Sequence, residues 1–189
     1  MSQTTSAEGQ SFGGIDPGKD GALAVIRPDL SVQFFDVPTV EVEMSTKTKA
    51  GNKKKKRVYL PAEMALILRN ARLASLTLER ATAQPRRIGP RIIPMGAQYA
   101  FAAGEGFGIW QGLLAALEIP YDIVAAVTWK ARLLAGQPKT KEAAVPAICQ
   151  LYPAAAAHLR GPRGALLVDR ADALFLAHYG KQKALGLLG

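Results

Sequence analysis

Four acidic side chains stand where they could bind divalent cations and act on a phosphodiester. Asp16 and Glu79 each end a short apolar run, as expected at the end of a buried strand. Asp169 and Asp172 are three residues apart at the start of a helical pattern, so both carboxylates share one helix face. Carboxylate oxygens favour Mg²⁺ or Mn²⁺ over zinc. Two such ions could activate a water and stabilise the leaving oxygen of a phosphodiester.

Each acid also has an explanation that needs no metal. The Asp-Pro-Gly sequence at Asp16 is a turn signal. Glu79, followed by Arg80, is equally well a surface ion pair, and Asp169 could be the N-cap of its helix. The four together favour the metal site, because clustered carboxylates repel one another and gain nothing for binding a polyanion.

The chain is strongly basic. Its 189 residues contain 24 Lys and Arg against 15 Asp and Glu, a formal net charge of +9 at pH 7. This balance favours a polyanionic partner, with nucleic acid as the first candidate. The competing partner, an anionic membrane, has no strongly amphipathic basic helix in its support, and no apolar run is long enough to span a bilayer. The single cysteine, Cys149, excludes an intramolecular disulfide and a cysteine zinc site.

Apolar and turn patterns predict an α/β protein with a mixed sheet. Strands are expected in five places: residues 12–17, 22–27, 32–37, 74–78 and 121–127. Helices are expected from residue 60 onward and at 98–117, 140–151 and 170–179. The first three strands should be antiparallel, because tight turns join them.

One folded domain, residues 12–180, accounts for most of the chain. We expect residues 1–11 to be a disordered leader and 181–189 to be a C-terminal tail. Residues 45–57 are basic and of low complexity, which predicts a flexible loop within the domain.

Several motifs, in order along the chain, resemble the RuvC-like Holliday-junction resolvases. They are Ile-Asp-Pro-Gly at 15–18, Gly-Ala-Leu-Ala at 21–24, Leu-Glu at 78–79 and Asp-Arg-Ala-Asp-Ala-Leu at 169–174. More of the chain resembles the monokaryotic-chloroplast resolvases of plants and algae. That resemblance lies in residues 35–40, the Lys/Arg-rich loop, the Gly-rich stretch 104–112, Thr-Trp-Lys at 128–130, Thr-Lys-Glu at 140–142 and residues 171–180.

The resemblance implies a ribonuclease H-like fold, with a mixed central sheet flanked by helices. It implies a homodimer that binds four-way junction DNA and nicks two opposing strands symmetrically, with two Mg²⁺ or Mn²⁺ ions per active site. Asp16, Glu79 and Asp172 would hold the metal with Asp169 as the fourth ligand, and Lys141 would stabilise the scissile phosphate. The plant members carry His and Gly at the positions of Val168 and Asp169, so this sequence is closer to the bacterial Asp-x-x-Asp arrangement.

Basic and aromatic residues are predicted to contact the DNA. They are Lys53, Lys54, Lys55, Lys56, Arg57, Arg86, Arg87, Arg91, Lys130, Phe107 and Trp129. For any single lysine of the run a solvated loop is an equally good explanation. For Trp129, core packing and base stacking are equally good explanations. Phe107 is partly explained as core, and the glycines around it indicate close approach of DNA or of a partner subunit.

The leading hypothesis is a structure-selective endonuclease that resolves four-way junctions and leaves 5′ phosphate and 3′ hydroxyl ends. A ribonuclease H-type enzyme acting on RNA–DNA hybrids shares the metal site and stays open. A junction-binding protein without catalysis also stays open, although it has no use for four acids. The compartment follows the source: the chloroplast nucleoid in a plant or alga, the cytoplasm in a bacterium or phage host.

Overall fold

The computed structural model describes residues 9–47, 50–82, 86–88, 90–94, 96–136 and 141–188, and of 86–88, 91–93 and 141–143 the backbone only. Most of the expected leader, 1–11, lies outside these residues, but Ser11 already belongs to the first strand. Among the described helices none is both long and apolar enough to cross a membrane.

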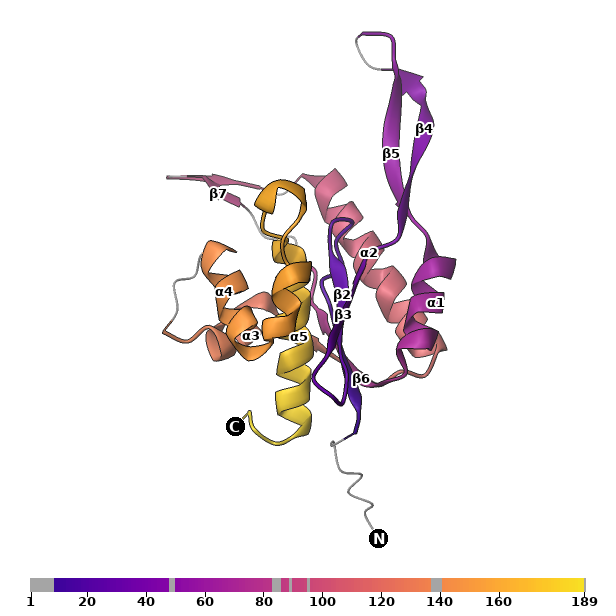
Figure 1. Cartoon of the computed structure of the whole chain (residues 1–189). Coiled ribbons are helices and arrows are strands. Elements are labelled where there is room, and N and C mark those ends of the chain that lie inside the picture. The colour runs from indigo at the N-terminus through magenta and orange to yellow at the C-terminus, as the bar shows by residue number, and fades with distance from the viewer. Residues whose placement is uncertain are drawn as a thin grey trace.

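A five-stranded mixed sheet forms the centre of the molecule (Figure 1). Its strands, in spatial order, are β3 (Val32–Asp36), β2 (Ala22–Ile26), β1 (Ser11–Ile15), β6 (Leu73–Glu79) and β9 (Tyr121–Val124). The first three are antiparallel, whereas β6 runs parallel to both β1 and β9. The predicted α/β protein with a mixed sheet is therefore confirmed.

Helices cover both faces of this sheet (Figure 1). On one face lie α1 (Pro61–Ala71) and α2 (Ala97–Ala116). On the other lie α3 (Ala126–Leu133), α4 (Lys141–Leu151) and α5 (Val168–Ala184). Two short 3₁₀ helices, Pro153–His158 and Pro162–Gly164, connect α4 to α5. Because α5 continues to Ala184, it includes the first residues of the expected tail at 181–189.

The alternation of side chains along β2 divides the core into two halves. Ala22, Ala24 and Ile26 pack with α3, α4 and α5, while Leu23 and Val25 pack with α1 and α2. All five are buried. A central strand that is apolar on both faces is what a sheet covered by helices on both sides requires.

The flexible loop predicted at 45–57 was wrong for residues 45–47 and 53–57, which lie in strands. Strands β4 (Thr39–Lys47) and β5 (Lys53–Tyr59) pair as a long hairpin that projects from the body (Figure 1). Opposite charges meet across it, with Lys53 bound to Glu43 at 2.8 Å and Lys55 to Glu41 at 3.3 Å. Such cross-strand pairs favour sheet formation in a sequence that composition alone marks as solvated.

Two further segments differ from the prediction. A short second hairpin, β7 (Arg86–Ile88) and β8 (Arg91–Ile93), forms where no strand was predicted. The strand expected at 121–127 ends at Val124, and α3 begins two residues later. Periodicity does not separate such short apolar runs into strand and helix.

Glycines let α5 approach the sheet closely. A Cβ at Gly14 of β1 would overlap the carbonyl oxygen of Ala173 and the amide nitrogen of Ala177, and a Cβ at Gly180 would overlap Thr77 of β6. These contacts fix where α5 lies along the sheet. They therefore also fix the position of its first turn, which carries the two predicted acids.

Replacing Gly14 with alanine should push α5 off the sheet. Since the overlapping atoms are backbone atoms, we expect Gly14→Ala to lower the free energy of unfolding by about 1–3 kcal/mol, as overpacked cores do. Urea denaturation followed by circular dichroism measures it. Gly108→Ala on α2, where a Cβ meets nothing within 4 Å, is the matched control. It should be neutral or stabilising, and equal losses in the two variants would contradict the packing account.

Candidate active site

Asp16 is held by the turn between β1 and β2. Its backbone N–H donates to the carbonyl oxygen of Ala22 at 3.0 Å, and its Oδ1 accepts from the N–H of Gly18 at 3.4 Å. A Cβ at Gly21 would overlap the carbonyl oxygen of Asp16, so this tight turn requires glycine there. The Asp-Pro-Gly turn signal is therefore real, and its effect is to fix one carboxylate at the strand end.

Glu79 lies beside Asp16 because the strands before them are parallel neighbours. Ile15 of β1 is in register with Leu78 of β6, so each acid follows at the carboxyl end of its strand. Adjacent strands are about 4.8 Å apart. Both side chains line one pocket of about 220 Å³, together with Arg80.

Trp129 orients the Glu79 carboxylate. Its indole Nε1 donates to Glu79 Oε2 at 2.8 Å, and its ring stacks on Phe175 of α5 with centroids 5.7 Å apart. The side chain is 0% exposed. Base stacking by Trp129 was therefore a wrong prediction, because no ring face is accessible, and the residue instead joins the core to an acid of the site.

Asp172 comes from the first turns of α5 and pairs with a lysine of α3. Lys130 Nζ lies 3.0 Å from Asp172 Oδ2 and 4.7 Å from the centroid of the Trp129 ring. The phosphate contact predicted for Lys130 stays a prediction. In the protein alone, its ammonium neutralises part of the charge of the acidic site.

Asp169 is the second residue of α5, and the N-cap is Leu167. The N-cap explanation for Asp169 was therefore wrong. Its negative charge acts on Asp16 and helps to raise the pKa of that carboxyl. An acid in the first turn is also favoured by the helix dipole.

The four acids share one electrostatic field. Burial, followed by the charge of Glu79, raises the pKa of Asp16 to about 7, with Asp169 and Asp172 adding to the rise against the Gly18 hydrogen bond. Burial also raises the pKa of Glu79, and Asp172 adds to it, while the Trp129 hydrogen bond and Lys130 oppose the rise. Clustered carboxylates that hold protons this tightly are typical of functional sites.

The chemistry of these donors fits a hard divalent cation, since all are carboxylate oxygens whose repulsion a cation would relieve. Their arrangement fits less well. Within the described residues, no three His, Cys, Asp or Glu side chains are placed so that they could hold a metal ion. Two of the acids are bound to Trp129 and Lys130. The assignment of the four acids as metal ligands therefore stays a prediction.

Other predicted contacts are placed only in part. Lys141 opens α4, and Arg86, Arg87 and Arg91 lie on β7 and β8, but their side chains are outside the described part of the structure. Phe107 belongs to α2, is partly buried, and packs against the half of the core that α1 and α2 cover. Its contact with DNA or a partner subunit stays a prediction.

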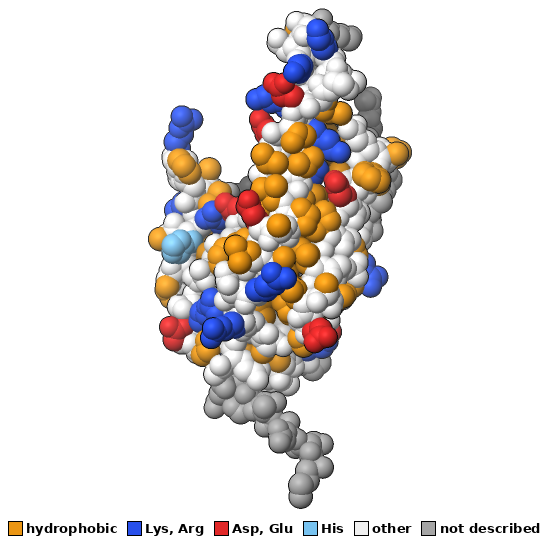
Figure 2. All heavy atoms as spheres, turned by 90° about the vertical axis from the view of Figure 1, so that its right-hand side faces the viewer, with side chains coloured by type: hydrophobic (Ala, Val, Ile, Leu, Met, Phe, Trp, Pro, Cys, Tyr) orange, Lys and Arg blue, Asp and Glu red, His pale blue; other side chains and the backbone are white. Residues whose placement is uncertain are grey.

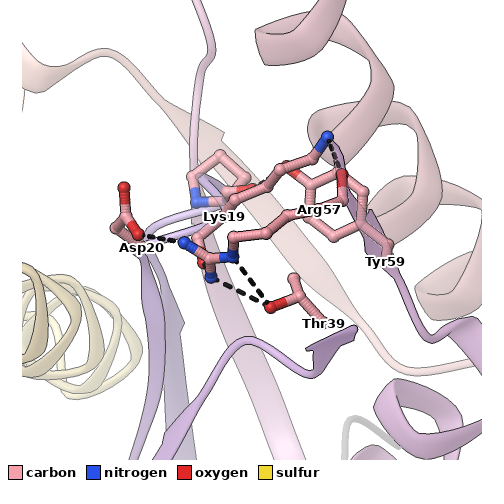
Figure 3. Close-up of polar contacts among 6 residues, drawn as sticks. Lys19, Asp20, Thr39, Arg57 and Tyr59 are labelled. Carbon is pink, nitrogen blue, oxygen red and sulfur yellow. Dashed lines mark hydrogen bonds and ion pairs between the residues drawn. The ribbon is translucent and has the colours of Figure 1, made fainter. Parts of the chain in front are cut away.

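Arg57 connects the base of the hairpin to the Asp16 turn (Figure 3). Its guanidinium donates to Thr39 Oγ1 at 2.9 and 3.2 Å, to the Lys19 carbonyl oxygen and to Asp20. In return, Lys19 Nζ donates to the Arg57 carbonyl oxygen at 2.8 Å. In the protein alone Arg57 therefore has a positioning role, and the DNA contact predicted for it stays a prediction. Sequence reasoning missed this network because its partners are up to 38 residues apart.

Comparison with known proteins supports the fold. No family model and no curated protein matches the chain. A Thermus thermophilus RuvC in complex with a Holliday junction substrate is similar, with a TM-score of 0.54, 14% identity, and coverage of 94% of this chain and 97% of that chain. A second Thermus thermophilus RuvC structure is similar with a TM-score of 0.50 and 16% identity, and the match covers 94% of this chain and 97% of that chain. The chain has the ribonuclease H-like fold. The sheet flanked by helices that the motifs implied is therefore confirmed.

Removing Arg57 should loosen the hairpin from the body. We expect Arg57→Ala to lower the melting temperature by about 4 °C, equivalent to about 1–2 kcal/mol for a chain of this size. Arg57→Lys should restore little, because an ammonium cannot reproduce the fork of donors. Differential scanning calorimetry measures both. Lys54→Ala, on the same strand, is the control and should leave the melting temperature unchanged; full rescue by lysine would contradict the network.

The shifted Asp16 carboxyl should make stability depend on pH. Its folded pKa of about 7 exceeds the ordinary 3.8, so its contribution is complete below about pH 4 and is lost as the pH rises to about 7. Asp16→Asn cannot ionise. At about pH 8 without divalent metal, the free energy of unfolding of Asp16→Asn should exceed that of wild type by about 2 kcal/mol, after allowance for solvent screening.

That difference should shrink as the pH falls toward 4. Chemical denaturation at a series of pH values measures it, with Glu63→Gln, an exposed carboxylate on α1, as the matched control. A variant that is less stable than wild type at every pH would contradict the shift.

Proposed function

We propose that this protein is a metal-dependent endonuclease that acts on four-way DNA junctions. The observation that carries the proposal is that Asp16 and Glu79 line one pocket at the strand ends of a ribonuclease H-like fold. Asp172 joins them through α3, where the consecutive residues Trp129 and Lys130 bind Glu79 and Asp172. The basic hairpin beside them supports it, because it offers phosphate contacts next to the acids. One of the similar RuvC structures is in complex with a Holliday junction substrate, which supports the choice of junction DNA.

The acids would hold Mg²⁺ or Mn²⁺, two ions per site, through Asp16, Glu79 and Asp172, with Asp169 as the fourth ligand. When bound, such ions activate water and neutralise charge on the leaving oxygen. The protein's own residues prepare this site. Trp129 holds Glu79 in one orientation, and the Asp16 turn presents its carboxylate from a fixed backbone.

Lys130 would exchange partners when substrate arrives. In the protein alone it pairs with Asp172 and its side chain is partly exposed. A cation beside Asp172 would make this pairing redundant and release the ammonium for a phosphate oxygen. Lys141 is proposed to act in the same way on the scissile phosphate, and the products would carry 5′ phosphate and 3′ hydroxyl ends.

A homodimer is part of the proposal. Each chain has one acidic site, and paired nicks on two opposing strands need two sites related by a two-fold axis. The closer resemblance to the monokaryotic-chloroplast resolvases, and with it a chloroplast nucleoid location, rests on the motifs alone.

One observation favours a second candidate, a junction-binding protein that does not cleave. Within the described residues no three acids are placed so that they could hold a metal ion, and Lys130 pairs with Asp172. A binding protein could keep such a neutralised site without any reaction.

Cleavage of a synthetic four-way junction separates the candidates. Wild type is compared with Asp16→Asn, Glu79→Gln and the control Glu63→Gln, with and without Mg²⁺ or Mn²⁺. We expect paired symmetric nicks that need metal and fall at least ~100-fold in the first two variants, because even outer-shell changes at metal sites cost ~10–100-fold. Tight junction binding without a nick would establish the binding protein. Preferential cleavage of an RNA–DNA hybrid over the junction would establish the ribonuclease H-type alternative.

A further inference from the structure

A groove of about 600 Å³ lies between the β4–β5 hairpin and α2. The Lys53–Arg57 run and Met44 line it from the hairpin, Phe101 lines it from α2, and Lys19 lines it from the β1–β2 turn. Figure 2 shows Lys and Arg side chains mixed with Asp and Glu near the free end of the hairpin, and hydrophobic side chains over the face below it. The groove is therefore basic along one wall, and the other carries an aromatic side chain and Glu105, whose charge is paired with Lys19 at 3.3 Å.

The lysines of the basic wall differ in their pairing. Lys53 and Lys55 are bound to Glu43 and Glu41 across the hairpin. Lys54 and Lys56 alternate with them, are exposed, and have no ion-pair partner among the described residues. Two unneutralised ammonium groups at alternate positions of one strand are suited to successive phosphates of one nucleic-acid strand.

Phe101 supplies the second half of such a site. Its side chain is 71% exposed although it is a large apolar group, and it borders the groove opposite the lysines. Aromatic rings beside a basic groove are the platforms on which single-stranded nucleic acids stack their bases. A base inside a duplex is stacked on both faces, so it can use this ring only if it is unstacked, as in a single strand.

The groove adjoins the acidic pocket. Lys19 lines the groove, and Asp16, three residues earlier, lines the pocket, so their Cα atoms are at most ~11 Å apart. On α2 the neighbouring residues Ala102 and Ala103 line the groove and the pocket, respectively. One nucleic-acid strand could therefore pass from the pocket into the groove.

We propose that this groove binds the DNA strand next to the cleaved phosphodiester, with Lys54 and Lys56 on its phosphates and Phe101 under an unstacked base. The assignment rests on the proposed nuclease function for the position of the strand. The binding itself does not require cleavage, and the test is made without divalent metal.

Fluorescence anisotropy of a labelled single-stranded oligonucleotide, over a series of salt concentrations, tests the lysines. Lys54→Gln with Lys56→Gln should weaken binding and reduce the slope of log K against log salt by ~1.4, since each phosphate contact on a single strand contributes ~0.7. Arg69→Gln with Arg72→Gln, outside the groove lining, removes the same net charge and is the matched control. An equal fall in slope for both double variants would overturn the site.

Phe101→Ala tests the stacking platform. It should weaken single-strand binding ~10-fold, within the range of aromatic stacking, and leave the salt slope and duplex binding unchanged. Tyr99→Ala is the matched control, because Tyr99 is 75% exposed on the same helix and does not line the groove. Equal effects of the two substitutions, or none from Phe101→Ala, would overturn the proposal.

Two further outcomes distinguish DNA binding in this groove from a dimer interface and from the proposed nuclease function. If Phe101→Ala dissociates a dimer in sedimentation velocity and leaves DNA binding intact, the groove holds a second copy of the chain and the proposal is overturned. If wild type binds as expected but never nicks a junction in Mg²⁺ or Mn²⁺, the nuclease proposal fails while the groove is supported.

Discussion

The close packing of α5 against β1 is the constraint on which the acidic site depends. Gly14 leaves no side chain between the strand and the helix, and Gly180 does the same opposite Thr77. The first turn of α5 is thereby held near the carboxyl ends of β1 and β6, where Asp16 and Glu79 lie. Apolar burial thus stabilises a fold that brings together four acids whose charges repel one another.

The protein reduces the cost of this repulsion with partners from α3. Trp129, a core residue, donates its indole N–H to Glu79, and the next residue, Lys130, pairs with Asp172. Among the described side chains no cation forms an ion pair with Asp16, and burial with the charge of Glu79 raises its pKa to about 7. The site consequently holds clustered carboxylates whose charge Lys130 compensates only in part, which is a physical reason to expect a divalent cation there.

The sequence predicts the sheet well because β1, β2 and β6 are short apolar runs bounded by turn residues, and it predicts Asp16 and Glu79 at strand ends for the same reason. It fails where long-range contacts decide. In the hairpin, Glu41 and Glu43 pair with lysines of the opposite strand, which the composition of the basic segment does not show. Likewise, the burial of Trp129 and the internal role of Arg57 depend on partners that composition does not reveal.

The acidic site exists only if the four acids converge, and the pKa of the Asp16 carboxyl reports on that convergence. Carbon-13 NMR titration of the metal-free protein, in wild type and in Glu79→Gln, measures this pKa at the carboxyl carbon. We expect the Asp16 carboxyl to have a pKa of about 7 in wild type and a clearly lower pKa in Glu79→Gln, which lacks the Glu79 charge. A pKa near the ordinary 3.8 in both proteins would show that the acids do not meet.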